Sequence, residues 1–303
     1  MARKRRKKKK INFISILIIL FSIVYALYEK EINETFGQYI SNPTFYEVDS
    51  NLVVTYLDVG QADAILIQNK SEAMLIDAGN NEDGELLVKY FKDEGITNFK
   101  YIVGTHPHED HIGGLDDVIN NFSVDKIFIP DVITTTKTFT DVLDAIEGKN
   151  LTYTVPEIGE SFNLGEAHIN VLYTGTNEKD LNNSSIVLKL TFGSNSFLFT
   201  GDAEKEVEKL ILNKDISADV LKIGHHGSEF STTDSFLRSV NPKYAIISVG
   251  EKNSYNHPND LIIDKLRNNN IEIHCTDEEG SIIVTSDGNN IKVNSKNTNT
   301  NGG

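Results

Sequence analysis

Short apolar runs alternate with amphipathic segments along most of the chain from Leu52 onward. The runs NLVVTYLDV, AILIQ and AMLIDAG predict three successive strands, because β-rich residues are bounded there by turn residues. In DGELLVKYFKDEG, Leu87, Tyr90 and Phe91 recur at helical spacing and predict a helix that ends near Gly95. The run YIVGT then predicts a short buried strand.

The second half of the chain continues this alternation without repeating the sequence. INVLY, SIVLKLTF, SFLFTGD, ADVLKIGHHG, YAIISVG, IEIHCTD and SIIVTS predict strands. AEKEVEKLILNK predicts a helix with Val207, Leu210 and Ile211 on one face, and further helices are expected from Asp234 to Val240 and in NDLIIDKLRNNN. Strands in hairpins, followed by strands that alternate with helices, favour an α/β sandwich, while periodicity alone leaves a doubly wound fold open.

A different pattern occupies the N-terminus, where the 18 residues of INFISILIILFSIVYALY (11–28) carry no charge. As a helix this run would be about 27 Å long, which is enough to cross the hydrocarbon core of a membrane. The basic run RKRRKKKK before it favours a cytoplasmic N-terminus and an external body. Because no convincing small-residue cleavage site follows, the run predicts an uncleaved single-pass anchor in the cell membrane rather than a signal peptide. Cleavage of the run would instead release a secreted protein.

These patterns divide the chain into five segments. We expect a basic cytoplasmic tail (1–10), a transmembrane anchor (11–28), a polar stalk (29–50), one folded domain (51–294) and a disordered tail (295–303). The last segment is assigned from its low-complexity sequence, SKNTNTNGG, which cannot bury enough apolar surface to fold.

Composition changes this picture in two respects. Eight of the 29 Lys and Arg residues lie in RKRRKKKK, so the remaining 21 face all 44 Asp and Glu residues and give residues 11–303 a net charge of −23. An acidic body weighs against strong nonspecific binding to nucleic acid, which depends on a cationic surface. The single cysteine, Cys275, excludes an intrachain disulfide, a redox CxxC pair and a cysteine-rich zinc site.

Candidate chemistry is concentrated in THPHEDHIGG (105–114), directly after the predicted strand YIVGT. This segment holds His106, His108, Asp110 and His111 of a chain with only eight histidines. Imidazole favours zinc and related transition metals, and carboxylate favours harder ions such as manganese. Sites in α/β proteins form at the carboxyl ends of strands, and the glycines that follow allow close backbone approach. The segment therefore predicts a metal site.

THPHEDH resembles the HxHxDH signature of the metallo-β-lactamase superfamily. LIDAG with Asp77, FLFTGD with Asp202, and LKIGHHGS with His225 and His226 resemble further motifs of that family, in the same order along the chain. YLDVGQADAILI, NNSSIVLKL and NSYNHP are similar to the branch that contains the lactamase-like domain of ComEC-type competence DNA-uptake proteins. Ala62 stands where that branch usually has glycine.

The resemblance covers about residues 52 to 285 and implies an αββα sandwich of two mixed β-sheets flanked by helices, here preceded by the transmembrane anchor. It also implies two divalent ions, Zn²⁺ or Mn²⁺, that generate a bound hydroxide as the nucleophile. The metal ligands that it implies are His106, His108, Asp110, His111, Asp202 and His225. One ion would be held by His106, His108 and Asp202, and the other by Asp110, His111, Asp202 and His225.

Several further residues receive roles from the same resemblance or, as for Asp63, His168 and Cys275, from their place in the predicted strands and turns. Asn183 and Ser184 stand where many members carry another histidine ligand, which is why the first ion would have only three protein ligands. The candidate catalytic residues are Asp110, His226 and His257. The residues expected to surround the ligands are Asp77, Asp63, Asn183 and Ser184. Tyr255 is expected to shape the pocket, whereas His168 and Cys275 are expected to be structural.

We therefore expect a metal-dependent phosphodiesterase or nuclease that acts outside the membrane on a phosphodiester, with no protein partner evident from the sequence. One alternative is a phosphodiesterase of the cell wall, acting on teichoic acid or phosphorylcholine esters. Another is a noncatalytic extracellular binding module that retains the fold.

Overall fold

The computed structural model describes residues 51–176 and 179–296, which belong to one compact unit, Glu47–Gly303. The predicted basic tail, transmembrane anchor and stalk (1–50) lie outside the described residues. Within the described part of the chain, no helix is both long enough and apolar enough to cross a membrane. The division of the chain into five segments therefore stays a prediction.

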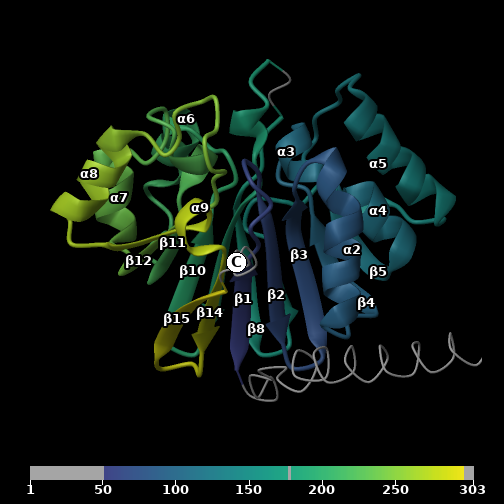
Figure 1. Ribbon diagram of the computed structural model, residues 1–303, viewed down its shortest axis with the longest axis horizontal. Helices are drawn as coiled ribbons and strands as arrows, with labels where there is room; N and C mark the ends of the chain where they lie inside the picture. Colours follow the sequence, from purple (N-terminus) through teal and green to yellow (C-terminus); the bar gives the residue numbers. More distant parts are fainter. Residues whose placement is uncertain (1–50, 177–178, 297–303) are drawn as a thin grey trace, which may run out of the picture. The chain divides into compact units, whose positions relative to one another are not determined.

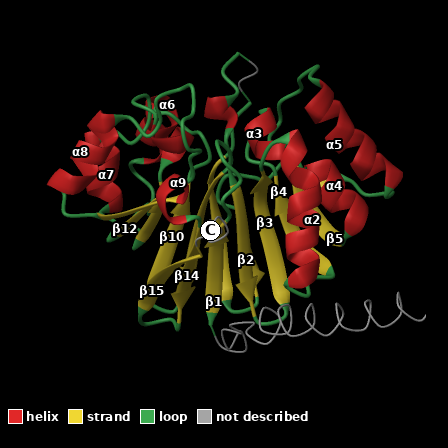
Figure 2. Cartoon of the chain, in the orientation of Figure 1, coloured by secondary structure: helices red, strands yellow, loops and turns green. Residues whose placement is uncertain are grey.

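The described residues form four layers, with two β-sheets packed face to face and helices on the outer face of each sheet (Figure 1, Figure 2). Both sheets combine parallel and antiparallel strand pairs. The predicted αββα arrangement of two mixed sheets flanked by helices is thus confirmed for this part of the chain.

The first sheet contains β1 (Leu52–Tyr56), β2 (Ala64–Asn69), β3 (Glu72–Ala78), β4 (Asn98–Val103), β5 (Ser123–Phe128), β6 (Tyr153–Thr154), β14 (Ser281–Ser286) and β15 (Ile291–Lys296). The second contains β7 (Ser161–Leu164), β8 (Ala167–Tyr173), β9 (Val187–Phe192), β10 (Asn195–Phe199), β11 (Val220–Lys222), β12 (Tyr244–Ile247) and β13 (Glu272–Cys275). The strand orders are β15-β14-β1-β2-β3-β4-β5-β6 and β13-β12-β11-β10-β9-β8-β7. Strand β15 includes the first two residues of the predicted tail.

The helices are α2 (Gly84–Asp93), α3 (Glu109–Ile112), α4 (Leu115–Asn121), α5 (Lys137–Gly148), α6 (Lys205–Ile211), α7 (Asp234–Val240), α8 (Asp260–Asn268) and α9 (Thr276–Glu279). Three short 3₁₀ turns are η1 (Asn81–Asp83), η2 (Asn182–Ser184) and η3 (Gly224–Gly227). Figure 1 shows α2, α4 and α5 along one sheet and α6, α7 and α8 along the other.

Apolar side chains hold these layers together. The central layer is formed by the facing sides of both sheets, as where Tyr56 of β1 lies 6.3 Å, between ring centroids, from Phe199 of β10. In α6, Val207 and Ile211 pack on the second sheet as predicted, but Leu210 is 62% exposed. Because Leu210 lies about 100° around the helix from Ile211, it falls outside the buried stripe.

The topology brings strand ends from both sheets to one region. Strands β3 and β4 run parallel, and so do β10, β11 and β12. The histidine-rich segment follows β4, Asp77 lies at the end of β3, and the motifs TGD, GHHGS and NSYNHP follow β10, β11 and β12. Loops at the carboxyl ends of strands are where α/β folds build their sites.

The two glycines after the histidines fix this segment against the loop that follows β3. The backbone N–H of Gly113 donates to the carbonyl of Gly79, and that of Gly114 donates to the carbonyl of Ala78. A Cβ atom on Gly113 would lie 2.2 Å from the carbonyl carbon of Asn80, which no side chain can tolerate without movement. The predicted close backbone approach is confirmed at this position.

Candidate metal centre

Residues 104–108 connect β4 to α3, and this connection together with the first turn of α3 carries four of the predicted ligands. His106 and His108 lie in the connection, and the extended backbone of His108 (φ −81°, ψ 152°) precedes the first residue of α3. Asp110 and His111 therefore lie in the first turn of the helix. His106 and His111 are fully buried.

The carboxylate of Asp202, which follows β10, lies between four imidazoles. Its Oδ1 atom is 3.2 Å from His111 Nε2 and 3.8 Å from His226 Nε2. Its Oδ2 atom is 3.7 Å from His225 Nε2 and 3.9 Å from His106 Nε2. Each oxygen thus faces a different pair of histidines.

Asp202 and the four histidines around it form a cluster, and His108 and Asp110 lie next to it on opposite sides. His108 Nδ1 lies 3.0 Å from His106 Nε2, on the side of Asp202 Oδ2. Asp110 Oδ2 lies 3.4 Å from His226 Nε2, on the side of Asp202 Oδ1. The structure therefore gathers all six residues predicted as metal ligands, together with His226.

Two of the imidazoles are oriented through their other ring nitrogen. The Nδ1 atom of His226 lies 2.9 Å from the backbone carbonyl of Ser248, which can only accept a hydrogen bond. The Nδ1 atom of His111 lies 2.8 Å from the Asp77 carboxylate. When each Nδ1–H donates to its oxygen, the lone pair at each Nε2 atom points toward Asp202, as is usual for metal-binding histidines.

His225 is oriented in the same manner by a carboxylate that the sequence analysis did not identify. Its Nδ1 atom lies 3.2 Å from Glu204 Oε1. Glu204 is itself held in place, because its backbone N–H donates to Asn183 Oδ1 at 3.0 Å and the Asn182 amide donates to its carboxylate at 3.3 Å. Asn183 thus supports the cluster indirectly.

Asp77 ties the histidine-rich segment to β3. It accepts hydrogen bonds from the backbone N–H and the hydroxyl of Thr105, both at 2.7 Å, in addition to its contact with His111. Asp77 has a left-handed backbone conformation (φ +57°), which is unfavourable for a residue with a side chain and is found most often at functional sites. This geometry agrees with the orienting role expected for Asp77.

Ser184 was expected to lie beside the metal ligands, but the hydroxyl that contacts them belongs to the next residue, Ser185. Ser184 donates to the carbonyl of Leu181 within η2. The Ser185 hydroxyl instead lies 3.3 Å from His106 Nδ1 and accepts from the backbone N–H of Asp202 at 3.1 Å. The turn η2 decides which of the two serines in NNSS faces the cluster, and the sequence pattern did not predict this turn.

A buried ion pair lies behind His226. Lys222 and Asp63 have exposed side-chain fractions of 0% and 1%, and Lys222 Nζ lies 2.9 Å from Asp63 Oδ2. Asp63 Oδ1 is 3.6 Å from His226 Nδ1. Asp63 therefore lies close to the cluster as expected, whereas Lys222 was not predicted because it reads as part of an apolar strand.

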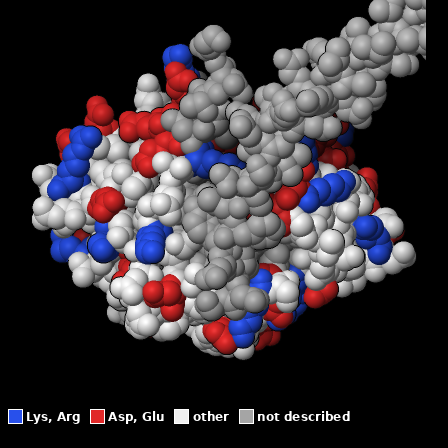
Figure 3. Space-filling view, turned by 60° about the horizontal axis from the view of Figure 1, so that its bottom comes forward, with Lys and Arg blue, Asp and Glu red and all other residues white. Residues whose placement is uncertain are grey.

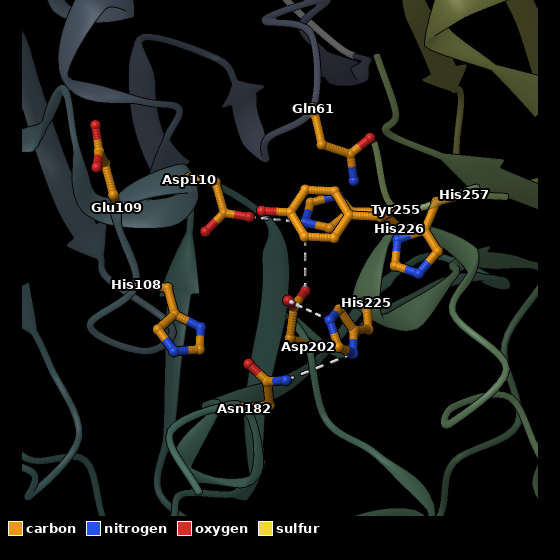
Figure 4. A pocket seen from close by; sticks show the side chains of 10 residues that line it. All are labelled: Gln61, His108, Glu109, Asp110, Asn182, Asp202, His225, His226, Tyr255 and His257. Carbon is orange, nitrogen blue, oxygen red and sulfur yellow. Dashed lines mark hydrogen bonds and ion pairs between the residues drawn. The ribbon is translucent and has the colours of Figure 1, made fainter. Parts of the chain in front are cut away.

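A cavity of about 300 Å³ opens onto the cluster (Figure 4). Its lining residues are Gln61, His108, Glu109, Asp110, Asn182, Asp202, His225, His226, Tyr255 and His257. None of these ten residues is Lys or Arg. The predicted catalytic residues Asp110, His226 and His257 all face the cavity, and Tyr255 forms part of its wall as expected.

Burial and charge set the ionisation of this cluster. Burial opposes the ionised form of Asp202, but the attraction of His111 and His226 holds its pKa well below the usual range. The same balance, dominated among the attractive contributions by His111, lowers the pKa of Asp110. Burial lowers the pKa of His106. Burial and the positive charge of the neighbouring His225 lower the pKa of His257 to about 4.

The donor atoms fit divalent cations. Among the described residues, three buried atoms of the cluster have no hydrogen-bond partner, namely His111 Nε2, His226 Nε2 and Asp202 Oδ1. Leaving buried polar atoms unpaired is costly, and coordination of a cation would satisfy all three. His106, His111 and Asp202 offer ligand atoms within 4.8 Å of one another, and so do Asp110, His111 and His226.

Comparison with known proteins gives matches across this region. Residues 57–251 match a family described as the Metallo-beta-lactamase superfamily. ComE operon protein 3 of Bacillus subtilis is 30% identical over 250 residues, which cover 76% of this chain and 32% of that protein. Recombination protein 2 of Haemophilus influenzae is 29% identical over 286 residues, covering 92% of this chain and 32% of that protein. The chain thus spans about a third of the length of these relatives.

A solved structure shows the same fold at low sequence identity. The metallo-beta-lactamase fold protein YhfI from Bacillus subtilis aligns with a TM-score of 0.53 over 78% of this chain and 100% of that chain, at 12% identity. At this identity the similarity concerns the fold alone.

The pair formed by Lys222 and Asp63 yields a test of the structure around the cluster. We predict that Lys222→Met lowers the free energy of unfolding by about 3–5 kcal/mol, because it leaves the buried Asp63 carboxylate without its cation. Urea denaturation in the presence of EDTA measures this effect without a contribution from metal binding. Adding Asp63→Asn to Lys222→Met should recover part of the loss. Equal midpoints for wild type and Lys222→Met would contradict the buried ion pair.

Proposed function

The chain belongs to the metallo-β-lactamase superfamily, and from this membership we propose that it is a metal-dependent phosphodiesterase that cleaves nucleic acid. The resemblance inferred from the motifs, including the similarity to competence proteins, is confirmed by the matched relatives. The phosphodiesterase activity, the metals and the substrate are parts of the proposal.

One observation carries the metallohydrolase part of this proposal. The buried Asp202 carboxylate has two imidazole nitrogens within 3.8 Å of one oxygen and two within 3.9 Å of the other. Carboxylate oxygens and imidazole Nε2 atoms that converge in this way are the donor set of paired zinc or manganese ions. Although His111 Nε2 lies 3.2 Å from Asp202 Oδ1, these two atoms and His226 Nε2 make no hydrogen bond of normal geometry, and coordination of a cation would satisfy all three.

We assign the two adjacent histidines to different ions. His225 would join His106 and His108 at the ion near Asp202 Oδ2, where the sequence led us to expect no further imidazole. His226 would join Asp110 and His111 at the ion near Asp202 Oδ1, the position expected for His225. Both adjacent residues have left-handed backbones, with φ of +51° and +52°, which turn their side chains toward the cluster from different directions.

With the ions placed in this way, Asp110 and His257 can each be given a role in catalysis. Divalent ions held there would lower the pKa of a water molecule and stabilise the negative charge that develops on the phosphoryl group. Asp110 faces the cavity and would orient that water by accepting a hydrogen bond from it. His257, with its pKa near 4, is neutral at pH 7. It would therefore donate a hydrogen bond from a neutral ring to the leaving group, since little imidazolium is present.

The substrate class rests on the relatives and on charge. The name of the relative Recombination protein 2 refers to recombination, in which DNA strands are cut and rejoined. On the visible part of one face, Lys and Arg side chains are scattered among Asp and Glu (Figure 3). Two divalent ions would add about +4 to a cavity whose lining contains no Lys or Arg. We therefore propose that local recognition at the cavity, rather than a broad cationic surface, selects the nucleic acid.

We also propose that residues 11–28 anchor the protein in a membrane, with the enzyme on the extracytoplasmic side. The support is the uncharged apolar run and the basic residues before it. Deletion of residues 1–28 should move the protein from the membrane fraction to the soluble fraction of lysed cells, as measured by immunoblotting. If the truncated chain sediments with membranes as before, the anchor is wrongly assigned.

Replacement of one ligand tests the catalytic assignment. We expect His108→Ala to abolish hydrolysis of bis-p-nitrophenyl phosphate and of single-stranded DNA and to reduce the bound metal, with the fold retained by circular dichroism. His168→Ala is the matched control, because His168 is exposed and its ring bonds to Asn163 across a hairpin, away from the cluster. Zinc and manganese are supplied separately, and teichoic-acid fragments are included as an alternative substrate.

The outcomes separate the proposals. Full turnover by His108→Ala would show that the site is wrongly assigned. Hydrolysis of the generic diester and of teichoic acid, but not of DNA, would favour a cell-wall enzyme. A wild-type chain that binds no metal and hydrolyses none of these substrates would favour a noncatalytic module.

The assignment of His225 can be tested through Glu204. We expect Glu204→Gln to weaken the binding of one of the two ions by about 10–100-fold, because a carboxylate that orients a ligating imidazole contributes this much to metal affinity. Calorimetric titration of the metal-free protein measures both binding steps. Glu206→Gln, an exposed position in the first turn of α6, the helix that Glu204 precedes, serves as the control. Unchanged affinity for both ions in Glu204→Gln would remove His225 from the ligand set.

A further inference from the structure

Tyr255 is unusual among the residues that line the cavity, because its ring is 66% exposed and takes no part in the apolar core. Figure 4 shows this ring across the cavity, in front of His226 and between Asp110 and His257 in that view. A large exposed aromatic side chain at the mouth of a site is a common means of binding the flat face of a ligand.

The ring of Tyr255 is supported from one side by His257. The two ring centroids lie 5.8 Å apart, and the planes differ by only 24°. His257 in turn meets the candidate ligand His225 edge to face, with centroids 5.6 Å apart. The exposed ring is therefore the outer member of a row of three rings that leads to the metal centre.

The loop that carries Tyr255 and His257 is held by one side chain. Asn253 Oδ1 accepts hydrogen bonds from the backbone N–H of Tyr255 at 3.1 Å and from that of His257 at 3.0 Å. The Asn253 amide also donates to the carbonyl of Gly250 at 3.0 Å. These bonds fix the relative position of the two rings before any ligand arrives, which reduces the entropic cost of binding.

We propose that Tyr255, backed by His257, is a stacking platform for a nucleobase adjacent to the phosphodiester that is cleaved. This inference rests on the proposed function and adds to it a binding subsite for single-stranded nucleic acid. A single flat ring supported from behind suits a planar base, and every base has such a face. Recognition of a quaternary ammonium group, as in a choline ester, uses several rings arranged as a cage. Tyr255 is the only Phe, Tyr or Trp among the residues lining the cavity.

The composition of the cavity supports the same assignment. With no Lys or Arg in its lining, the cavity offers a phosphate no cationic side chain, so the ions would be the main partners of a phosphate inside it. Glu109 adds a carboxylate to the wall, which repels phosphates further. Affinity for a nucleic acid must therefore come from contacts with its neutral parts, and stacking on an aromatic ring is the strongest contact of this kind that the cavity offers.

The experiment compares two substrates of equal length with the full-length protein in detergent, supplied with zinc or manganese. One is a single-stranded oligonucleotide, and the other is the same strand with stable abasic sites in place of its bases. We expect Tyr255→Ala to raise KM for the strand with bases about tenfold and to leave kcat/KM for the abasic strand within twofold. Tyr255→Phe should behave as wild type, because the ring face is retained. Tyr153→Ala, an exposed tyrosine in β6, is the control.

A second measurement follows stacking directly. A phosphorothioate oligonucleotide that resists cleavage carries 2-aminopurine, whose fluorescence is quenched when it stacks on an aromatic ring. We expect wild type and Tyr255→Phe to quench this fluorescence and Tyr255→Ala to leave it unchanged at saturating protein.

The possible results separate this inference from the proposed function. Equal KM values of wild type and Tyr255→Ala for the strand with bases, or equal quenching by both, would overturn the platform while leaving the nuclease intact. Loss of hydrolysis of both strands in Tyr255→Ala would assign the ring to the chemistry and also overturn it. A wild type that hydrolyses glycerophosphocholine and neither strand would overturn the platform together with the nucleic-acid substrate.

Discussion

The buried carboxylate of Asp202 is the constraint around which the rest of this structure is arranged. A carboxylate with almost no access to water must be compensated by cations or hydrogen bonds, and here four imidazoles surround it. Each of these rings needs its own partner to point the correct nitrogen inward. For His111, His225 and His226 these partners are Asp77, Glu204 and the Ser248 carbonyl. The cluster and its partners therefore come from the ends of β3, β4, β10, β11 and β12, and so extend into both sheets.

The sequence predicted those parts of the site that lie within one segment or directly after one strand. His106, His108, Asp110 and His111 are neighbours in the chain, so their convergence follows from a single turn into a helix. Asp77 and Asp202 were assigned from the resemblance of LIDAG and FLFTGD to motifs of the metallo-β-lactamase superfamily. The division that we propose between His225 and His226 did not follow from the sequence, because it depends on two left-handed backbone conformations that no residue pattern indicates. Lys222, Ser185 and Glu204 were missed because their contacts join elements far apart in the sequence.

The same distinction holds for the fold. The strands and helices with strong apolar periodicity were predicted, as was their arrangement in two mixed sheets. Helix α5 was not predicted, although Phe139, Val142 and Ile146 recur at helical spacing and Thr136 caps its first turn by accepting from the Phe139 N–H. Strand β15 was missed because only Ile291 and Val293 mark it as a strand, and pairing with β14 supplies the remaining order. Weak local patterns become elements here when a neighbouring strand or sheet provides a surface.

The ligands of the cluster come from both halves of the sandwich. His106, His108, Asp110 and His111 belong to connections of the first sheet, whereas Asp202, His225 and His226 follow strands of the second. An ion held by both groups would act as a non-covalent cross-link between the loops of the two sheets. Its binding free energy would then add to the cohesion of the whole domain. Removal of such an ion by a chelator would then lower the resistance of the whole domain to proteolysis.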